Sequence, residues 1–171
     1  MDTAARMVPY VTEGQKIGII LGFVGAEFAF KRVIDKGCIL YGFQRVHSIA
    51  RLKEYGKAVY QLGRKHKIEM GSISASNVSD ICDFIEGIFN IPCVSLYNYL
   101  SVSLMPSNPI LHTSRLYSIF KDYAPGKKYA RNFLFYREWS LEAAQLMISC
   151  DDELQSLCKE IPINHFFLGV L

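Results

Sequence analysis

The chain has 171 residues, half of them hydrophobic, and a mildly basic net charge of +3. This length suits one ordinary domain, or one moderate domain with part of another, and the apolar content excludes a disordered chain. Short basic runs at 64–67 and 127–128 are interpreted as solvated turns. Runs this short do not form the extended basic face that nucleic-acid binding needs. No stretch of the sequence is long and apolar enough to span a membrane.

The five cysteines stand at spacings that match neither a metal site nor a disulfide framework: Cys38, Cys82, Cys93, Cys150 and Cys158. Reduced thiols in a cytoplasmic protein are the interpretation that this pattern favours, and no metal is predicted. The N-terminus also lacks the features of a secretory signal.

The first part of the chain follows the plan of a βαβ unit. After the end of a helix near Pro9, the pattern predicts a strand over 16–21, a helix over 26–36 that stops at Gly37, and a second strand over 38–43. The first strand is short, apolar and β-branched, which predicts a parallel sheet buried on both faces.

Gly22 and Gly25 lie in the turn between that strand and the helix, and they are the candidate cofactor-binding residues. Their spacing is not the G-x-G-x-x-G of a dinucleotide fingerprint. Glycines let backbone approach a ligand, but a tight strand-to-helix turn also needs them for geometry alone.

The next part adds elements of a different kind. Residues 57–62 and 67–73 alternate polar and apolar side chains, which predicts an antiparallel hairpin with one wet face at the edge of the sheet. A helix is expected over 78–89, capped by Ser76 or Asn77, with an apolar stripe of Ile81, Phe84, Ile85 and Ile88. A short strand or an extended link follows at 92–96.

The remainder is predicted to be almost wholly helical. Asn108 is expected to cap a helix that begins at Pro109 and runs to about 123. Ser140 is expected to cap a second helix that ends near 150, and 151–153 to begin a third that ends before Pro162. The apolar segment 166–171 is expected to pack against something. The fold class is therefore α/β: a partial Rossmann-like sheet, mixed with an antiparallel hairpin, followed by the start of an all-helical domain.

His112 is the candidate catalytic residue, because it lies near a helix start where the α/β part gives way to the helical part. Ligands bind in clefts at such junctions. The alternative is a partly buried, hydrogen-bonded histidine with a structural role.

The segment from Ser107 to His112, with its Asn-Pro-Ile-Leu-His run, resembles the N-P-x-x-H signature of the opine dehydrogenases, the octopine/nopaline dehydrogenase family. Further similarities lie at Pro9-Tyr10, over 17–30, at Arg51 and in the Asp-x-Glu at 151–153. The resemblance implies a Rossmann domain that binds NAD or NADP and a helical domain that closes over the substrates.

By this resemblance, an amino acid condenses with an α-keto acid and hydride reduces the product to a secondary amine. His112 would be the acid/base, and Asn108 and Arg115 would bind substrate. Arg115 suits a carboxylate because guanidinium pairs with it through two hydrogen bonds. A surface arginine on an amphipathic helix is the alternative for that residue.

The sequence departs from the family pattern at both ends. It has no G-x-G-x-x-G, and it ends before the Arg and Asp that the family carries downstream of the histidine. The expectation is an internal fragment, inactive by itself: 1–104 from the dinucleotide-binding domain and 105–171 from the start of the helical domain. A non-catalytic interaction domain and a ketopantoate reductase-like enzyme are the alternatives, and a homodimer that buries 166–171 and leaves His112 inaccessible would favour the first of them.

Overall fold

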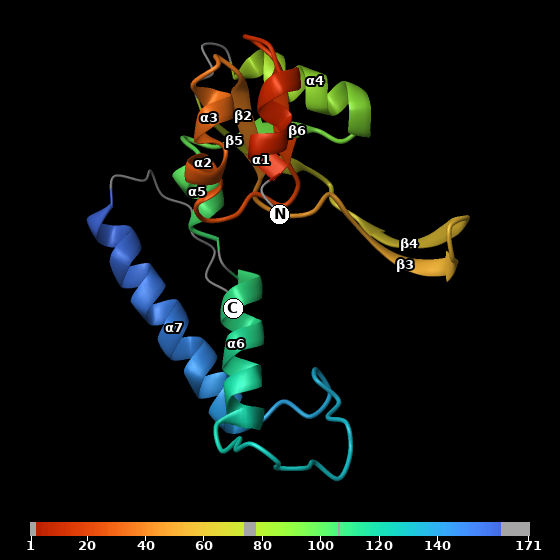
Figure 1. The fold of residues 1–171 in the computed structure, drawn as a ribbon, viewed down its shortest axis with the longest axis vertical. Helices are drawn as coiled ribbons and strands as arrows, with labels where there is room; N and C mark the ends of the chain where they lie inside the picture. Colours follow the sequence, from red (N-terminus) through yellow and green to blue (C-terminus); the bar gives the residue numbers. More distant parts are fainter. Residues whose placement is uncertain (1–2, 74–77, 106, 162–171) are drawn as a thin grey trace. The chain divides into compact units, whose positions relative to one another are not determined.

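The computed structural model describes residues 3–73, 78–105 and 107–161 (Figure 1). The chain divides into two compact units, residues 1–105 and residues 106–171. The first unit is built on β-strands and the second on two helices. Each unit is described by itself.

The first unit opens with the predicted βαβ arrangement. Its early elements are α1 (Thr3–Met7), the 3-10 helix η1 (Val8–Tyr10), β1 (Lys16–Ile19), α2 (Ala26–Ala29), α3 (Lys31–Ile34) and β2 (Ile39–Phe43). β1 and β2 pair in parallel, with Lys16 opposite Ile39, as the sequence predicts. The predicted helix over 26–36 is divided at Phe30, and Gly37 ends it with a φ of +82°. In β1 only Ile17 is buried, so the predicted burial on both faces is wrong.

The central sheet is mixed. Its strand order is β1-β2-β5-β6, where β5 is Ile68–Ile73 and β6 is Cys93–Ser95. β5 runs antiparallel to β2 and parallel to β6. The unit ends with α5 (Leu100–Ser103).

The predicted hairpin of 57–62 with 67–73 is wrong. β4 (Ala58–Arg64) instead pairs with β3 (Ser48–Glu54), and the two form a separate antiparallel ribbon. β5 lies inside the sheet because Ile68 and Met70 are apolar and buried there, so its alternation does not mark a wet face. The turn between β3 and β4 uses Gly56, whose φ is +70°.

Two apolar clusters form the core of the first unit. One gathers Ile17, Val33 and Leu40 between β1, β2 and α3, and the other gathers Phe43, Met70 and side chains of α4 (Ser79–Phe89). The buried stripe of α4 is Ile81, Cys82 and Ile85, whereas the predicted Phe84 and Ile88 are exposed. The predicted caps Ser76 and Asn77 lie outside the described residues.

The second unit consists of α6 (Ser107–Phe120), α7 (Leu141–Glu160) and an irregular segment between them. α6 begins at Ser107, so Asn108 lies inside the helix and the prediction of Asn108 as its cap is wrong. Ser140 caps α7 as predicted, because its Oγ accepts a hydrogen bond from the N–H of Ala143 at 3.2 Å.

The predicted break near Cys150 is also wrong, because α7 is one continuous helix through residues 151–153. The apolar segment 166–171 lies outside the described residues. Among the residues that are described, no helix is both long and apolar enough to cross a membrane.

Candidate active site

His112 lies on α6, and two aromatic residues of the irregular segment surround it. Its imidazole is half-buried, and its Nε2 stands 3.2 Å from the hydroxyl of Tyr136, at hydrogen-bond distance. The ring of Phe135 meets it edge-on, with 5.2 Å between centroids. Since Tyr136 is 68% exposed, its hydroxyl links the imidazole to the outer surface of this unit. His112 is therefore held in a hydrogen-bonded, partly open position that is compatible with either of its two interpretations.

Arg115 follows His112 on the same helix, and its side chain is buried, with only 4% exposed. Its Nε donates to the carbonyl oxygen of Phe135 at 3.1 Å, and its guanidinium stands 5.9 Å from the centre of the Trp139 ring. Its Nη1 also lies 3.4 Å from the hydroxyl of Ser118. The alternative of a surface arginine is therefore wrong, because the indole and a backbone carbonyl enclose this cation.

Phe135 contacts both His112 and Arg115, two of the predicted site residues on α6. Its ring packs on His112 and its carbonyl holds Arg115. Phe135, Tyr136 and Trp139 were not among the predicted site residues. The density of aromatic residues over 133–139 was the available signal, since amphipathic rings with polar tips are common where one side of a site is apolar and the other is wet.

A hollow of about 430 Å³ lies beside Arg115, and its lining is polar and apolar in about equal parts. Arg131 pairs with Glu138 at 2.7 Å, and Lys121 pairs with Glu142 at 2.6 Å. The hydrogen bond from Arg131 lowers the pKa of the Glu138 carboxyl below its ordinary value. His112 is not one of the lining residues, which are Arg115, Ser118, Ile119, Arg131, Phe133, Glu138, Ser140 and Glu142.

Asn108 is exposed near the start of α6, and the structure shows no side-chain partner for it among the described residues. Within α6, Thr113 and Ser114 instead bond back to carbonyls of the preceding turn, at 2.7 Å each. The predicted role of Asn108 in binding substrate stays a prediction.

The two glycines predicted to bind a cofactor lie in the first unit, and local structure explains each of them. The N–H of Gly22 donates to the carbonyl of Phe43 at 2.8 Å, and a Cβ on Gly22 would collide with Val102. Gly25 adopts a φ of +83°, which glycine tolerates best, and a Cβ there would meet nothing within 4 Å. Their contact with a cofactor stays a prediction.

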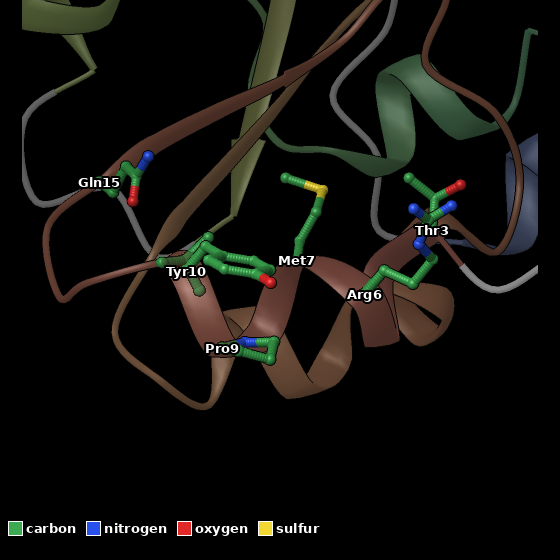
Figure 2. A pocket seen from close by; sticks show the side chains of 7 residues that line it. Thr3, Arg6, Met7, Pro9, Tyr10 and Gln15 are labelled. Carbon is green, nitrogen blue, oxygen red and sulfur yellow. The ribbon is translucent and has the colours of Figure 1, made fainter.

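A second hollow, of about 620 Å³, lies against α1 and η1 in the first unit. Figure 2 shows the ring of Tyr10 and the side chains of Met7 and Pro9 along it, with Arg6 and Thr3 at one side. Its lining is mainly apolar, and Arg6 is the one charged residue among the described residues that line it. It contains no acid/base pair that could carry the predicted chemistry.

Sequence comparison relates the chain to known dehydrogenases. The family profile described as NAD/NADP octopine/nopaline dehydrogenase, alpha-helical domain, matches residues 95–169, which include both His112 and Arg115. The chain is 27% identical over 161 residues to a tauropine dehydrogenase of Arabella iricolor, covering 90% of the chain and 40% of the relative. It is 25% identical to an uncharacterized protein of Sinorhizobium fredii, covering 89% of the chain and 42% of that protein.

Solved structures give the same result for the fold. An octopine dehydrogenase in complex with NADH and L-arginine superposes with a TM-score of 0.75 at 21% identity, over 95% of this chain and 42% of that one. Octopine dehydrogenase with NADH and pyruvate gives a TM-score of 0.71, over 95% of this chain and 43% of that one. The predicted α/β class is confirmed, and the chain spans about two fifths of the length of these proteins. The predicted resemblance is confirmed as well: residues 95–169 match the helical domain of the opine dehydrogenases, and the chain is similar in sequence to a tauropine dehydrogenase.

Proposed function

We propose that this chain forms part of an opine dehydrogenase-like oxidoreductase that joins an amino acid to an α-keto acid with NADH or NADPH as reductant. The observation that carries the proposal is the position of His112 beside a buried arginine, within the residues that match the helical domain of the family. In this proposal residues 1–104 belong to the cofactor domain and residues 105–171 belong to the substrate domain. The cytoplasm, suggested by the unpaired cysteines, is part of the same proposal.

In this proposal His112 moves a proton at the substrate oxygen. Neutral imidazole donates at one nitrogen and accepts at the other, so the residue can protonate a carbonyl oxygen and take the proton back in reverse. The Tyr136 hydroxyl at Nε2 and the Phe135 ring restrict how the imidazole turns. The proton therefore leaves from a fixed position.

Arg115 would bind the carboxylate of the keto acid, with Asn108 as a second substrate contact. The Nε of Arg115 is already occupied by the carbonyl of Phe135 and its Nη1 is near Ser118, which fixes the plane of the guanidinium. A fixed planar cation with further N–H groups suits a carboxylate. The hollow beside it provides space on one side.

The nicotinamide cofactor would supply the hydride when bound. Of the two glycines predicted to hold it, Gly22 has its N–H occupied by the carbonyl of Phe43, and Val102 fills the space beside it. The proposal therefore takes NAD or NADP from the relationship to the family and assigns no step to these glycines.

The test is an activity assay on the natural full-length protein that contains these residues. NADH oxidation and opine formation are measured with pyruvate and a panel of amino acids, by absorbance and by mass spectrometry. His112→Gln is expected to lower kcat by about 100-fold or more, the usual contribution of a general acid/base. Arg115→Met is expected to raise KM for the keto acid more than KM for the amino acid.

Arg137→Met is the matched control, because Arg137 is an exposed arginine close to the same aromatic residues. It is expected to leave both constants unchanged. Wild-type activity in the His112→Gln variant, or no opine from any pair of substrates, would contradict the proposal.

A further inference from the structure

A further hollow, of about 360 Å³, lies against α6 within the second unit, and its lining is mainly apolar. Its volume falls within the range of small-molecule sites, roughly 300–1,000 Å³. The roles proposed for His112 and Arg115 do not use it. Its walls come from α6 and from the irregular segment between α6 and α7 (Figure 1), which contribute Leu116, Ile119, Phe120, Tyr129, Phe133 and Phe135.

Contacts between rings hold the aromatic wall of this hollow in place. The ring of Phe120 meets those of Tyr129 and Phe133 edge-on, with centroids 5.3 and 6.3 Å away, and Tyr129 meets Phe133 in the same way at 5.7 Å. Edge-to-face pairs of this kind are favourable. The hydroxyl oxygen of Tyr129 is covered, so this residue offers its ring to the hollow and no accessible polar atom. The wall is therefore preformed and apolar.

The charge at the hollow is already balanced. Arg131 is the one charged residue among the described residues that line it, and its guanidinium stands 5.7 Å from the centre of the Phe133 ring. Its Nη1 donates to both carboxylate oxygens of Glu138, at 2.7 and 3.0 Å. Moving another charge into apolar surroundings without a partner costs free energy. The hollow therefore favours a neutral, apolar group.

The hollow continues along the side of α6 that bears His112. Leu116 and Phe120 follow His112 at intervals of four residues, so the three side chains lie on one side of the helix, with a rise of about 5.4 Å for each turn. Phe135 lines the hollow and also packs on the imidazole, with 5.2 Å between ring centroids. A group in the hollow is therefore about one helical turn from the imidazole.

The hollow also adjoins the more polar one beside Arg115. Ile119, Arg131 and Phe133 line both of them. A compound that places a carboxylate at Arg115 can therefore extend an apolar group into the neighbouring space without leaving the second unit.

We propose that this hollow receives the side chain of the amino acid substrate, and that this substrate is a neutral amino acid with a large apolar side chain, such as leucine, methionine or phenylalanine. Leu116, Ile119 and Phe120 then determine which amino acid is used. The assignment rests on the proposed function, in which Arg115 holds the keto acid and His112 acts where the two substrates join.

Steady-state kinetics of the natural full-length protein with pyruvate and NADH test the assignment. The kcat/KM for leucine and phenylalanine is expected to exceed that for alanine by about tenfold or more, since a hydrophobic site discriminates by the apolar groups that it buries. Arginine and glutamate are expected to be poorer substrates than leucine. A kcat/KM for arginine, glutamate or alanine that equals or exceeds that for leucine would overturn the assignment and leave the proposed function standing.

Leu116→Ala widens the hollow without adding a charge near His112. The ratio of kcat/KM for phenylalanine to that for leucine is expected to rise about tenfold, while KM for pyruvate stays unchanged because Arg115 is untouched. Leu157→Ala is the matched control: it removes the same atoms from a residue of α7 that is 49% exposed, against 45% for Leu116, and that does not line the hollow. An unchanged ratio in Leu116→Ala would contradict the assignment.

Photochemical labelling of the wild-type full-length protein covers the case in which a variant fails to fold. A leucine analogue with a diazirine in its side chain is irradiated with the protein and NADH, and peptide mapping locates the links. Links to Leu116, Phe120 or Phe133 that excess leucine suppresses are expected. Links confined to other residues, or no link that leucine suppresses, would overturn the assignment. Suppressible links at the hollow without opine from any pair of substrates would contradict the proposed function instead.

Discussion

Phe135 is the residue on which the surroundings of both predicted site residues depend. Its ring restrains His112 and its carbonyl oxygen accepts the hydrogen bond of Arg115. A backbone carbonyl cannot be removed by substitution, so the position of Arg115 depends on the path of the irregular segment more than on the identity of any one side chain. The buried arginine in turn packs against Trp139.

Packing within the first unit constrains Gly22, whether or not a cofactor binds there. A Cβ there would overlap the side chain of Val102 and approach the carbonyl of Phe43 to 3.2 Å. Gly22→Ala is therefore expected to lower the free energy of unfolding by about 1–3 kcal/mol, the usual cost of overpacking, without any ligand present. Chemical denaturation measures this change.

Gly87→Ala is its matched control, because Gly87 lies inside α4 and a Cβ there would meet nothing within 4 Å. This variant is expected to stabilise the chain by about 0.5–1 kcal/mol, since alanine favours a helix over glycine. Equal stability of Gly22→Ala and wild type would show that Gly22 is not constrained by packing.

Cys93 is expected to react slowly with alkylating reagents. Burial, with a smaller contribution from the neighbouring Cys82, raises the pKa of its thiol to about 12. Because the thiolate is the nucleophile, its reaction with iodoacetamide at pH 8 is expected to be roughly 1,000-fold slower than in the unfolded chain. The rate should increase about tenfold per pH unit until the pH nears that pKa.

Peptide mapping by mass spectrometry, with and without urea, measures both rates. Cys82→Ala is expected to accelerate the reaction, because the Cys82 thiol contributes to the raised pKa of Cys93. Equal rates with and without urea would be inconsistent with the buried environment.

At the level of elements, the start of α7 depends on one side chain. The Ser140 hydroxyl accepts from the N–H of Ala143, one of the donors that a helix start leaves unsatisfied. Ser140→Ala is expected to cost about 0.5–2 kcal/mol of stability. Ser156→Ala in the same helix removes only a hydroxyl bonded back to Asp152 and is expected to be neutral, so thermal denaturation of the two variants gives a matched comparison.

The elements that sequence reasoning located correctly are those with a local cause. Ser140 signals its helix through capping chemistry, and the parallel pair β1–β2 follows from two apolar runs separated by one short helical segment. The prediction that a helix ends near Cys150 was wrong for the converse reason. Residues 151–153 have the composition of a helix start, but nothing before them ends α7, so the helix continues.

The hairpin shows why strand partners were harder to predict. β3, β4 and β5 follow one another with similar polar and apolar alternation, and a strand can pair with either neighbour. The Gly56 turn joins β3 to β4, whereas burial of Ile68 and Met70 draws β5 into the sheet. That choice depends on contacts distant in sequence, which local patterns do not contain. The same limit applies to His112 and Arg115, whose partners come from an irregular segment about 20 residues away.

On the scale of the whole molecule, apolar burial is distributed unequally. Both core clusters lie within residues 1–105, and of the described residues of the second unit only Ala143 is a buried hydrophobic residue. Since apolar burial is the main stabilising term in folding, the second unit is expected to unfold at a lower urea concentration than the first.

Trp139 makes this expectation measurable, because it is the one tryptophan of the chain and lies in the second unit. Its fluorescence should change before amide protons of β2 and β5 lose protection from hydrogen exchange. Ser140→Ala should shift only the fluorescence transition, and Gly22→Ala only the exchange transition. A single coincident transition would show instead that the two units unfold together.

The irregular segment between α6 and α7 affects how a site of this kind can change during evolution. It supplies the ring, the hydroxyl and the carbonyl that surround a histidine and an arginine carried by a regular helix. Irregular segments accept insertions and replacements that would break a helix. Descendants of one ancestral chain can therefore exchange the wall of the site while the helix that bears the histidine keeps its length and its register.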